Sequence, residues 1–190
     1  MSRVAEAFAA VPRDGFLPPE QRRFVRRDGA LPIGYGATNS QPSTVRAMLE
    51  LLDARPGDRV LDVGAGSGWT TALLAWLVGP EGRVVGVERI PQVLDFGRAN
   101  LTAAGPAGPV ELHLARPGAL GWPEAAPYDR VLVSADASAV PAPLVDQLAP
   151  DGVMVIPVRG EMLRIVRRAD DPQPEVERHG RYSFVPLVEE

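Results

Sequence analysis

The 190-residue chain contains neither cysteine nor lysine. The first absence excludes disulfides, thiolate nucleophiles and thiolate metal sites. The second excludes Schiff-base and lysine-base chemistry, and it leaves arginine as the source of all 20 basic side chains. Histidine is scarce, since only His113 and His179 occur, and neither has a second ligand at metal-site spacing. We therefore expect no bound metal.

Long apolar runs and an excess of positive charge are missing as well. No stretch approaches the roughly 18 apolar residues that a membrane-spanning helix needs. The first residues lack the basic and apolar regions of a signal peptide. The formal net charge is −4 and the pI is near 5.3, which argues against nucleic-acid binding. These features favour a cytoplasmic protein without a membrane or nucleic-acid partner, and we expect a monomer.

The segment 59–88 carries the most informative pattern. A short apolar strand at 59–63 leads directly into a glycine-rich turn at 64–68, and a helical pattern covers 69–77. A second apolar strand at 84–87 ends at Glu88. Strand, glycine turn, helix, strand and acid form the layout of a nucleotide-binding unit. The glycines allow the backbone to approach a ligand, and Glu88 is placed to accept the hydroxyls of a ribose.

Strands and helices alternate through most of the chain. Residues 4–27 read as helical with an interruption at Pro12, and a loop follows at 28–42. We expect helices at 43–52, with Ser43 as its cap, and at 91–104 and 143–148, and strands at 110–114, 130–134, 153–157, 162–167 and 181–186. This alternation predicts an α/β fold, a Rossmann-like doubly wound sheet that is mostly parallel, with an antiparallel C-terminal pair of strands. One domain is expected over 1–190, with an N-terminal segment at 1–55 and a sheet core at 56–190.

Four segments resemble the protein-L-isoaspartate O-methyltransferase family, whose members use S-adenosylmethionine. They are the segment 29–42, the glycine turn 64–68, the segment 87–90, and the segment 120–129 together with 184–188. The first and the fourth are specific to this family, whereas the other two occur in methyltransferases at large. The resemblance covers nearly all of the chain and implies a class I methyltransferase architecture.

The resemblance implies methyl transfer from S-adenosylmethionine to the α-carboxylate of an L-isoaspartyl residue in a damaged protein or peptide, with S-adenosylhomocysteine as the product. The ester would then collapse to a succinimide, which begins repair. A carboxylate is already ionised at neutral pH, so the nucleophile needs no general base. By resemblance, the catalytic residue is Ser40, whose hydroxyl would aim the carboxylate. The implied substrate-binding residues are Ala37, Thr38, Asn39, Ser40 and Asp136, and the implied cofactor-binding residues are Asp62, Gly64, Ala65, Gly66, Ser67, Gly68, Glu88, Arg89, Pro117 and Gly118.

Four positions depart from the family pattern: Arg116, Pro117, Asn39 and Asp136. The triplet Arg116, Pro117 and Gly118 stands where glycine, aspartate and glycine are usual. Pro117 thus replaces the aspartate expected at the adenine amino group, and proline supplies neither that acceptor nor a backbone N–H. Asn39 stands in place of isoleucine or valine, and Asp136 in place of alanine. Asp136 either lies near the methyl-transfer cleft or caps the following helix.

Two alternatives stay open at this point. The same fold and cofactor could serve to methylate a carboxylate of a dedicated biosynthetic peptide. The chain could also be a degenerate binding module that has lost catalytic activity. The reason to consider this is the replacement of the expected aspartate by Pro117. Cofactor affinity distinguishes the second alternative from an enzyme, and activity on isoaspartyl peptides distinguishes repair from the first.

Overall fold

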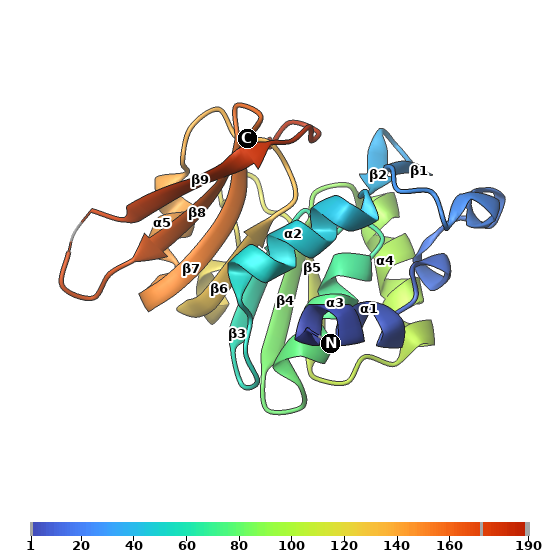
Figure 1. Cartoon of the computed structure of the whole chain (residues 1–190), viewed down its shortest axis with the longest axis horizontal. Coiled ribbons are helices and arrows are strands. Elements are labelled where there is room, and N and C mark those ends of the chain that lie inside the picture. The colour runs from blue at the N-terminus through green and yellow to red at the C-terminus, as the bar shows by residue number, and fades with distance from the viewer. Residues whose placement is uncertain (1, 172, 189–190) are drawn as a thin grey trace.

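The computed structural model describes residues 2–171 and 173–188 (Figure 1). Among these residues, a seven-stranded sheet has the strand order β5-β4-β3-β6-β7-β8-β9. Its strands are β3 (Arg59–Val63), β4 (Arg83–Glu88), β5 (Val110–Leu114), β6 (Tyr128–Val133), β7 (Leu148–Val158), β8 (Glu161–Arg167) and β9 (Glu175–Arg181), and a separate hairpin is formed by β1 (Leu31–Gly34) and β2 (Ala37–Asn39). The helices are α1 (Arg3–Ala10), α2 (Pro42–Leu52), α3 (Trp69–Val78), α4 (Pro91–Ala104) and α5 (Ala142–Asp146), with short 3-10 turns η1 (Arg13–Phe16), η2 (Pro19–Phe24) and η3 (Pro123–Ala125).

The sheet is doubly wound, as the sequence predicts. Strands β5, β4, β3, β6 and β7 are parallel, and β8 and β9 are antiparallel to their neighbours. From β3 the chain proceeds outward through β4 to β5, then returns to the other side of β3 for β6 and β7. The direction of winding therefore reverses between β3 and β6, where ligands bind in open sheets of this kind. The predicted fold class is confirmed.

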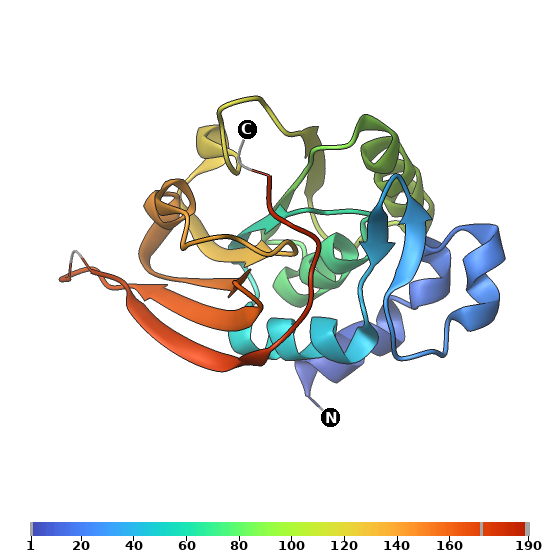
Figure 2. The same cartoon turned by 90° about the horizontal axis from the view of Figure 1, so that it is seen from above.

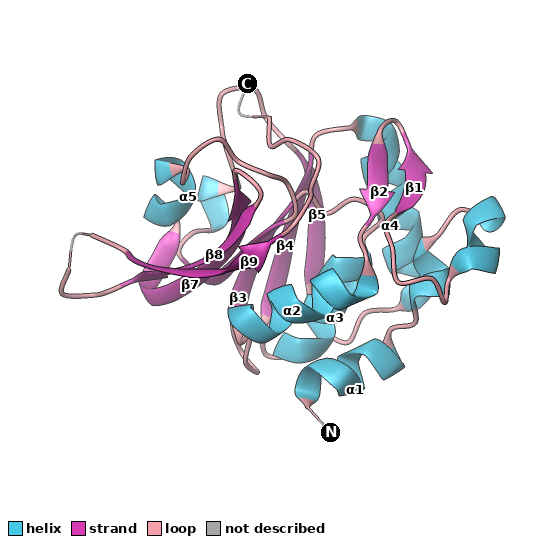
Figure 3. Cartoon of the chain, turned by 45° about the horizontal axis from the view of Figure 1, so that its top comes forward, coloured by secondary structure: helices cyan, strands magenta, loops and turns pink. Residues whose placement is uncertain are grey.

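Two apolar cores lie on opposite faces of the sheet. Adjacent residues of β3 divide between them, because successive side chains of a strand point to opposite faces. Val60 packs with α1, α2 and α3, whereas Leu61 packs with the residues around α5. Figure 3 shows α2 and α3 lying across the strands. Both faces of the central strands β3, β4 and β6 are thus buried, and their sequences are mostly apolar rather than alternating, whereas the edge strand β5 buries only Leu112.

Several expected segments differ from the structure. The loop expected at 28–42 contains the β1–β2 hairpin, and the helix expected at 143–148 is α5, which ends before β7 begins at Leu148. The helical pattern at 4–27 yields only one α-helix, α1, followed by the turns η1 and η2, because prolines at 12, 18 and 19 interrupt the backbone hydrogen bonds. The last strand was expected at 181–186 but is β9, which ends at Arg181. β9 is an edge strand with mostly exposed side chains, so its sequence has no apolar face that would reveal it.

Helix α2 is held at its N-terminus by a carboxylate from outside the helix. The prediction that Ser43 caps the helix is wrong, because Gln41 occupies the cap position, and its side chain makes no capping hydrogen bond to the helix main chain. Instead the main-chain N–H of Ser43 donates to Asp28 Oδ1 at 2.9 Å, and its hydroxyl donates to Asp28 Oδ2 at 2.8 Å. A negative charge here also suits the positive end of the helix dipole.

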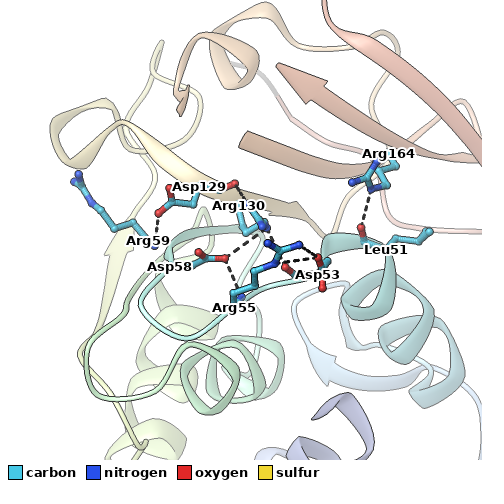
Figure 4. Close-up of polar contacts among 8 residues, drawn as sticks. All are labelled: Leu51, Asp53, Arg55, Asp58, Arg59, Asp129, Arg130 and Arg164. Atoms are coloured by element: carbon cyan, nitrogen blue, oxygen red, sulfur yellow. Dashed lines mark hydrogen bonds and ion pairs between the residues drawn. The ribbon is translucent and has the colours of Figure 1, made fainter. Parts of the chain in front are cut away.

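The C-terminus of α2 is held by two arginines from the sheet (Figure 4). Nε of Arg164 donates to the carbonyl of Leu51 at 3.0 Å, and Nε of Arg130 donates to the carbonyl of Asp53 at 3.1 Å. These carbonyls belong to the last turn, where the helix itself supplies no donor. Cations therefore meet the negative end of α2 as the carboxylate meets its positive end. No helix of the described residues is long and apolar enough to cross a membrane.

Replacing Asp28 by alanine should lower the melting temperature at neutral pH. Hydrogen bonds from Gln41 and Ser43 hold the pKa of Asp28 below its ordinary value. A carboxyl with a depressed folded-state pKa stabilises the fold above its unfolded pKa and loses that contribution as the pH falls through the folded pKa. The difference between wild type and Asp28→Ala should therefore shrink when thermal unfolding is measured at pH 3 instead of pH 7.

Asp95→Ala is the matched control, because Asp95 is an exposed carboxylate whose nearest cation, Arg98, lies 3.9 Å away. Such surface pairs contribute little, so this variant should unfold like wild type at both pH values. Equal losses in the two variants would contradict a special role for Asp28.

Candidate active site

A cavity of about 1240 Å³ opens at the carboxyl ends of β3, β4 and β6. Three segments that are distant in sequence form its walls: the loop 35–41, the glycine turn 63–67 and the C-terminal segment 181–188. Figure 2 shows that the C-terminal segment (red) crosses above the sheet and that the β1–β2 hairpin stands beside it. The cavity thus occupies the place where the winding of the sheet reverses.

The glycine turn is built from backbone that other residues adopt only with strain. Gly64 has a φ of 83° and Gly66 a φ of 55°, both in the left-handed region that favours glycine. Gly66 N–H donates to Glu88 Oε2 at 3.0 Å, and Ile90 N–H donates to Glu88 Oε1 at 2.9 Å. Glu88 is therefore fixed between the turn and the start of α4. Each of its oxygens retains a lone pair for a ligand in the cavity.

Helix α4 presses against the back of this turn. A Cβ added at Gly97 would lie 2.7 Å from the carbonyl oxygen of Gly66. A Cβ at Gly68 would lie 3.0 Å from Cγ of Leu101 and 3.1 Å from the carbonyl oxygen of Gly97. Gly68 does not line the cavity, so the structure explains it by helix packing rather than by ligand contact.

Asp62 lies beneath the turn rather than on the cavity wall. Its side chain is fully buried, Oδ2 accepts from Thr71 Oγ1 at 2.6 Å, and Oδ1 has no hydrogen-bond partner among the described residues. Burial, with a smaller contribution from the charge of Glu88, raises the pKa of Asp62 to about 6. Its position suits support of the turn through α3.

The predicted substrate loop lies on the opposite wall. Ala37, Thr38, Asn39 and Ser40 all line the cavity, but the side chain of Asn39 is only 3% exposed. Its Oδ1 accepts from Arg13 Nε at 2.6 Å and its Nδ2 donates to Ser67 Oγ at 2.9 Å. The sequence analysis missed Arg13, because contacts between residues 26 positions apart leave no trace in spacing or periodicity. Burial lowers the pKa of Arg13 to about 10, so it stays charged at neutral pH.

The segment after β5 forms a fourth part of the wall. Arg116 and Pro117 line the cavity, whereas Gly118 lies outside it in the turn that Ala119 N–H closes onto the carbonyl of Arg116 at 3.1 Å. Arg116 lies over the indole ring of Trp122 at 4.1 Å and forms an ion pair with Glu124. A guanidinium has no hydrogen-bond acceptor, so the side chain of Arg116 does not replace the acceptor lost at Pro117.

Asp136 lies beside the cavity, next in the chain to Ala135 of its wall, and it is not a helix cap. It does not line the cavity, and the N-cap of the following helix α5 is Pro141. Its Oδ1 accepts from Gly160 N–H at 2.9 Å, and its main chain bonds Val185 and Leu187 at 2.8 Å each. The capping interpretation is wrong: Asp136 fastens the C-terminal wall to the sheet. From the sequence, this wall was expected only as a strand at 181–186 and as the segment 184–188 that resembles the family.

The remaining predicted site residues lie where they were expected. The cavity wall includes Gly64, Ala65, Gly66, Ser67, Glu88 and Arg89. The glycine turn, the ribose-type acid and the serine loop therefore face one open cavity, which is large enough for a nucleotide-sized ligand together with part of a peptide.

Comparisons with known proteins agree with this arrangement. The sequence profile of the family Protein-L-isoaspartate(D-aspartate) O-methyltransferase (PCMT) matches residues 1–190. The protein-L-isoaspartate O-methyltransferase of Aeropyrum pernix is 49% identical, over 99% of this chain and 73% of that protein. The enzyme of that name from Methanopyrus kandleri is 48% identical, over 100% of this chain and 84% of that protein.

Solved structures agree as well. A protein-L-isoaspartate O-methyltransferase structure matches with a TM-score of 0.85 and 26% identity, covering 99% of this chain and 62% of that one, so this chain spans less than two thirds of its length. A Plasmodium falciparum structure of that description, in complex with S-adenosyl-L-homocysteine, shares the fold with a TM-score of 0.86 at 23% identity, covering 100% of this chain and 92% of that one. The family predicted from the sequence is confirmed: the chain belongs to the protein-L-isoaspartate O-methyltransferase family.

Proposed function

We propose that this protein transfers a methyl group from S-adenosylmethionine to the α-carboxylate of L-isoaspartyl residues in damaged proteins or peptides. The observation that carries the proposal is the single cavity that joins the glycine turn and Glu88 to the loop bearing Ser40. The relatives' shared name supports the same reaction. The net charge of −4 further favours a peptide over a nucleic acid as the substrate. The cytoplasmic location, the monomeric state and the single domain over 1–190 stay predictions from the sequence.

The residues present fit the cofactor. The positive φ angles at Gly64 and Gly66 favour glycine, and because glycine has no side chain, the main chain can approach a ligand closely there. Glu88 has lone pairs left to accept the two hydroxyls of a ribose. Pro117 would lie along the adenine. When bound, S-adenosylmethionine supplies an activated methyl group, and the electron pair of the broken C–S bond leaves on sulfur.

The protein's own task is to position the substrate carboxylate and to exclude water. The carboxylate is ionised at neutral pH, so no side chain has to remove a proton from it. We assign to the Ser40 hydroxyl the hydrogen bond that aims one carboxylate oxygen. Placing the reacting atoms about 3–3.5 Å apart and in line can supply a large share of the rate enhancement. The C-terminal wall, which Asp136 fastens, would cover the reacting groups from solvent.

A direct test combines calorimetric titration of S-adenosylhomocysteine with methyl transfer to an isoaspartyl peptide and to its aspartyl twin. We expect binding of S-adenosylhomocysteine and methylation of the isoaspartyl peptide alone. Binding without transfer to either peptide would favour the carboxylate of a dedicated peptide instead. A protein that does not bind S-adenosylhomocysteine would overturn the enzymatic function.

Ser40→Ala should lower kcat on the isoaspartyl peptide by about 10–100-fold, because the carboxylate loses the group that orients it. The affinity for S-adenosylhomocysteine should stay within about 3-fold of wild type, since Ser40 belongs to the opposite wall. Ser43→Ala is the matched control, because the Ser43 hydroxyl is already committed to Asp28 at 2.8 Å. A kcat for Ser40→Ala equal to that of Ser43→Ala would remove Ser40 from the mechanism.

Pro117→Asp should tighten the binding of S-adenosylhomocysteine. An acceptor at this position would pair an adenine amino group that the wild-type proline leaves without one, a difference of about 1–3 kcal/mol. We expect the dissociation constant from calorimetry to fall by at least about 5-fold. Pro117→Ala controls for the loss of the proline ring and should not tighten binding. An unchanged constant for Pro117→Asp would mean that another group already satisfies the amine.

A further inference from the structure

A buried arginine holds the main chain of the loop that carries Ser40. The side chain of Arg13 is 5% exposed. Its Nη2 donates to the carbonyl of Ser40 at 2.9 Å, to that of Asn39 at 3.1 Å and to that of Gly29 at 2.9 Å. Its Nη1 donates to the carbonyl of Arg27 at 3.1 Å. The planar fork of one guanidinium thus joins the chain segments that precede and follow the β1–β2 hairpin.

A second hydrogen bond extends this contact to the cofactor side of the cavity. Arginine is only a donor, so the Asn39 atom that faces Arg13 Nε at 2.6 Å must be the amide oxygen. The amide nitrogen then faces Ser67 Oγ at 2.9 Å. Ser67 follows Gly66 in the glycine turn, and its carbonyl accepts from Asn100 of α4 at 2.9 Å. Arg13, Asn39 and Ser67 therefore form a continuous chain from one wall of the cavity to the other.

Stability alone does not account for this arrangement. Burial lowers the pKa of Arg13 to about 10, which means that its surroundings disfavour the charged guanidinium. Among the described residues, no carboxylate lies within ion-pair distance of Arg13, and carbonyl oxygens surround it instead. Burying a charge is costly, and only good geometry with further hydrogen bonds offsets that cost. What the guanidinium provides, and an apolar side chain would not, is a fixed direction for each carbonyl.

We propose that Arg13 and Asn39 are positioning residues for methyl transfer. They would set the distance between the Ser40 loop and the glycine turn, and hence between the two reacting groups held on opposite walls. The inference rests on the proposed function. Its physical basis is the steep dependence of rate on geometry, since a misplacement of about 1 Å can lower the rate by about 100-fold.

The decisive comparison is between Arg13→Lys and Arg130→Lys. Arg130 is also buried, at 9% exposure, and donates to the carbonyls of Asp53 at 3.1 Å and Asp129 at 2.8 Å. It lies away from the cavity, near the start of β6. Lysine keeps the charge but loses the fork, so both variants should melt at lower temperature than wild type. Well below both melting temperatures, Arg13→Lys should lower kcat by at least about 10-fold with little change in the dissociation constant of S-adenosylhomocysteine, whereas Arg130→Lys should keep the wild-type kcat.

Asn39→Leu tests the second link without disturbing the charge. Leucine fills a similar volume but leaves Arg13 Nε and Ser67 Oγ without their partner. We expect a fall in kcat of at least about 10-fold here as well. Amide hydrogen exchange over residues 37–41 should be faster than in wild type for Arg13→Lys and Asn39→Leu, and unchanged for Arg130→Lys. This readout requires no turnover.

The outcomes separate the inference from the proposed function. Wild-type kcat in both Arg13→Lys and Asn39→Leu, or an equal loss in Arg130→Lys, would overturn the positioning role while leaving the methyltransferase reaction intact. A wild-type protein that neither binds S-adenosylhomocysteine nor methylates the isoaspartyl peptide would overturn the proposed function. In that case hydrogen exchange still decides whether Arg13 holds the loop.

Discussion

The close contact between helix α4 and the glycine turn is the constraint on which the rest of the site depends. The carbonyl of Gly66 approaches the helix so closely that a Cβ at Gly97 would lie 2.7 Å from it. A glycine inside a helix costs about 1 kcal/mol relative to alanine, so its presence marks a place where the backbone needs the space. This contact brings the start of α4 beside the turn, where Glu88 accepts hydrogen bonds from both segments. The contact therefore fixes the positions of the glycine turn and Glu88 in the cavity wall.

Local patterns in the sequence predicted those parts of the fold that local physics decides. The helix expected at 91–104 has the observed bounds, since Pro91 opens it and Gly105 follows it. The glycine turn and Glu88 were identified from the order of strand, turn and acid. Edge strand β9 was missed because its exposed faces need no apolar pattern. The cap that Asp28 provides was missed because its partner Ser43 lies 15 positions away.

The candidate site shows the same division. Most of the residues that the resemblance implied line one cavity, including the loop around Ser40, and their roles stay predictions. The resemblance did not separate residues that line the cavity from residues that hold the lining in place. Asp62 and Gly68 lie behind the glycine turn, and Asp136 holds the C-terminal segment by hydrogen bonds. Arg13 left no signal, because a lone arginine in a proline-rich stretch is ordinarily exposed. Burial lowers the pKa of Arg13 and raises that of Asp62, because it disfavours the charged form of each group.

The C-terminal wall has a consequence for the order in which the site is assembled during synthesis. The segment 182–188 follows every strand of the sheet along the chain, and main-chain bonds to Asp136 and to Gly160 hold it beside the cavity. Chains emerge from the ribosome N-terminus first. The nascent protein therefore possesses its glycine turn, Glu88 and Ser40 loop before the wall that completes the cavity exists. Translation itself delays the finished pocket until the sheet that supports it has been made.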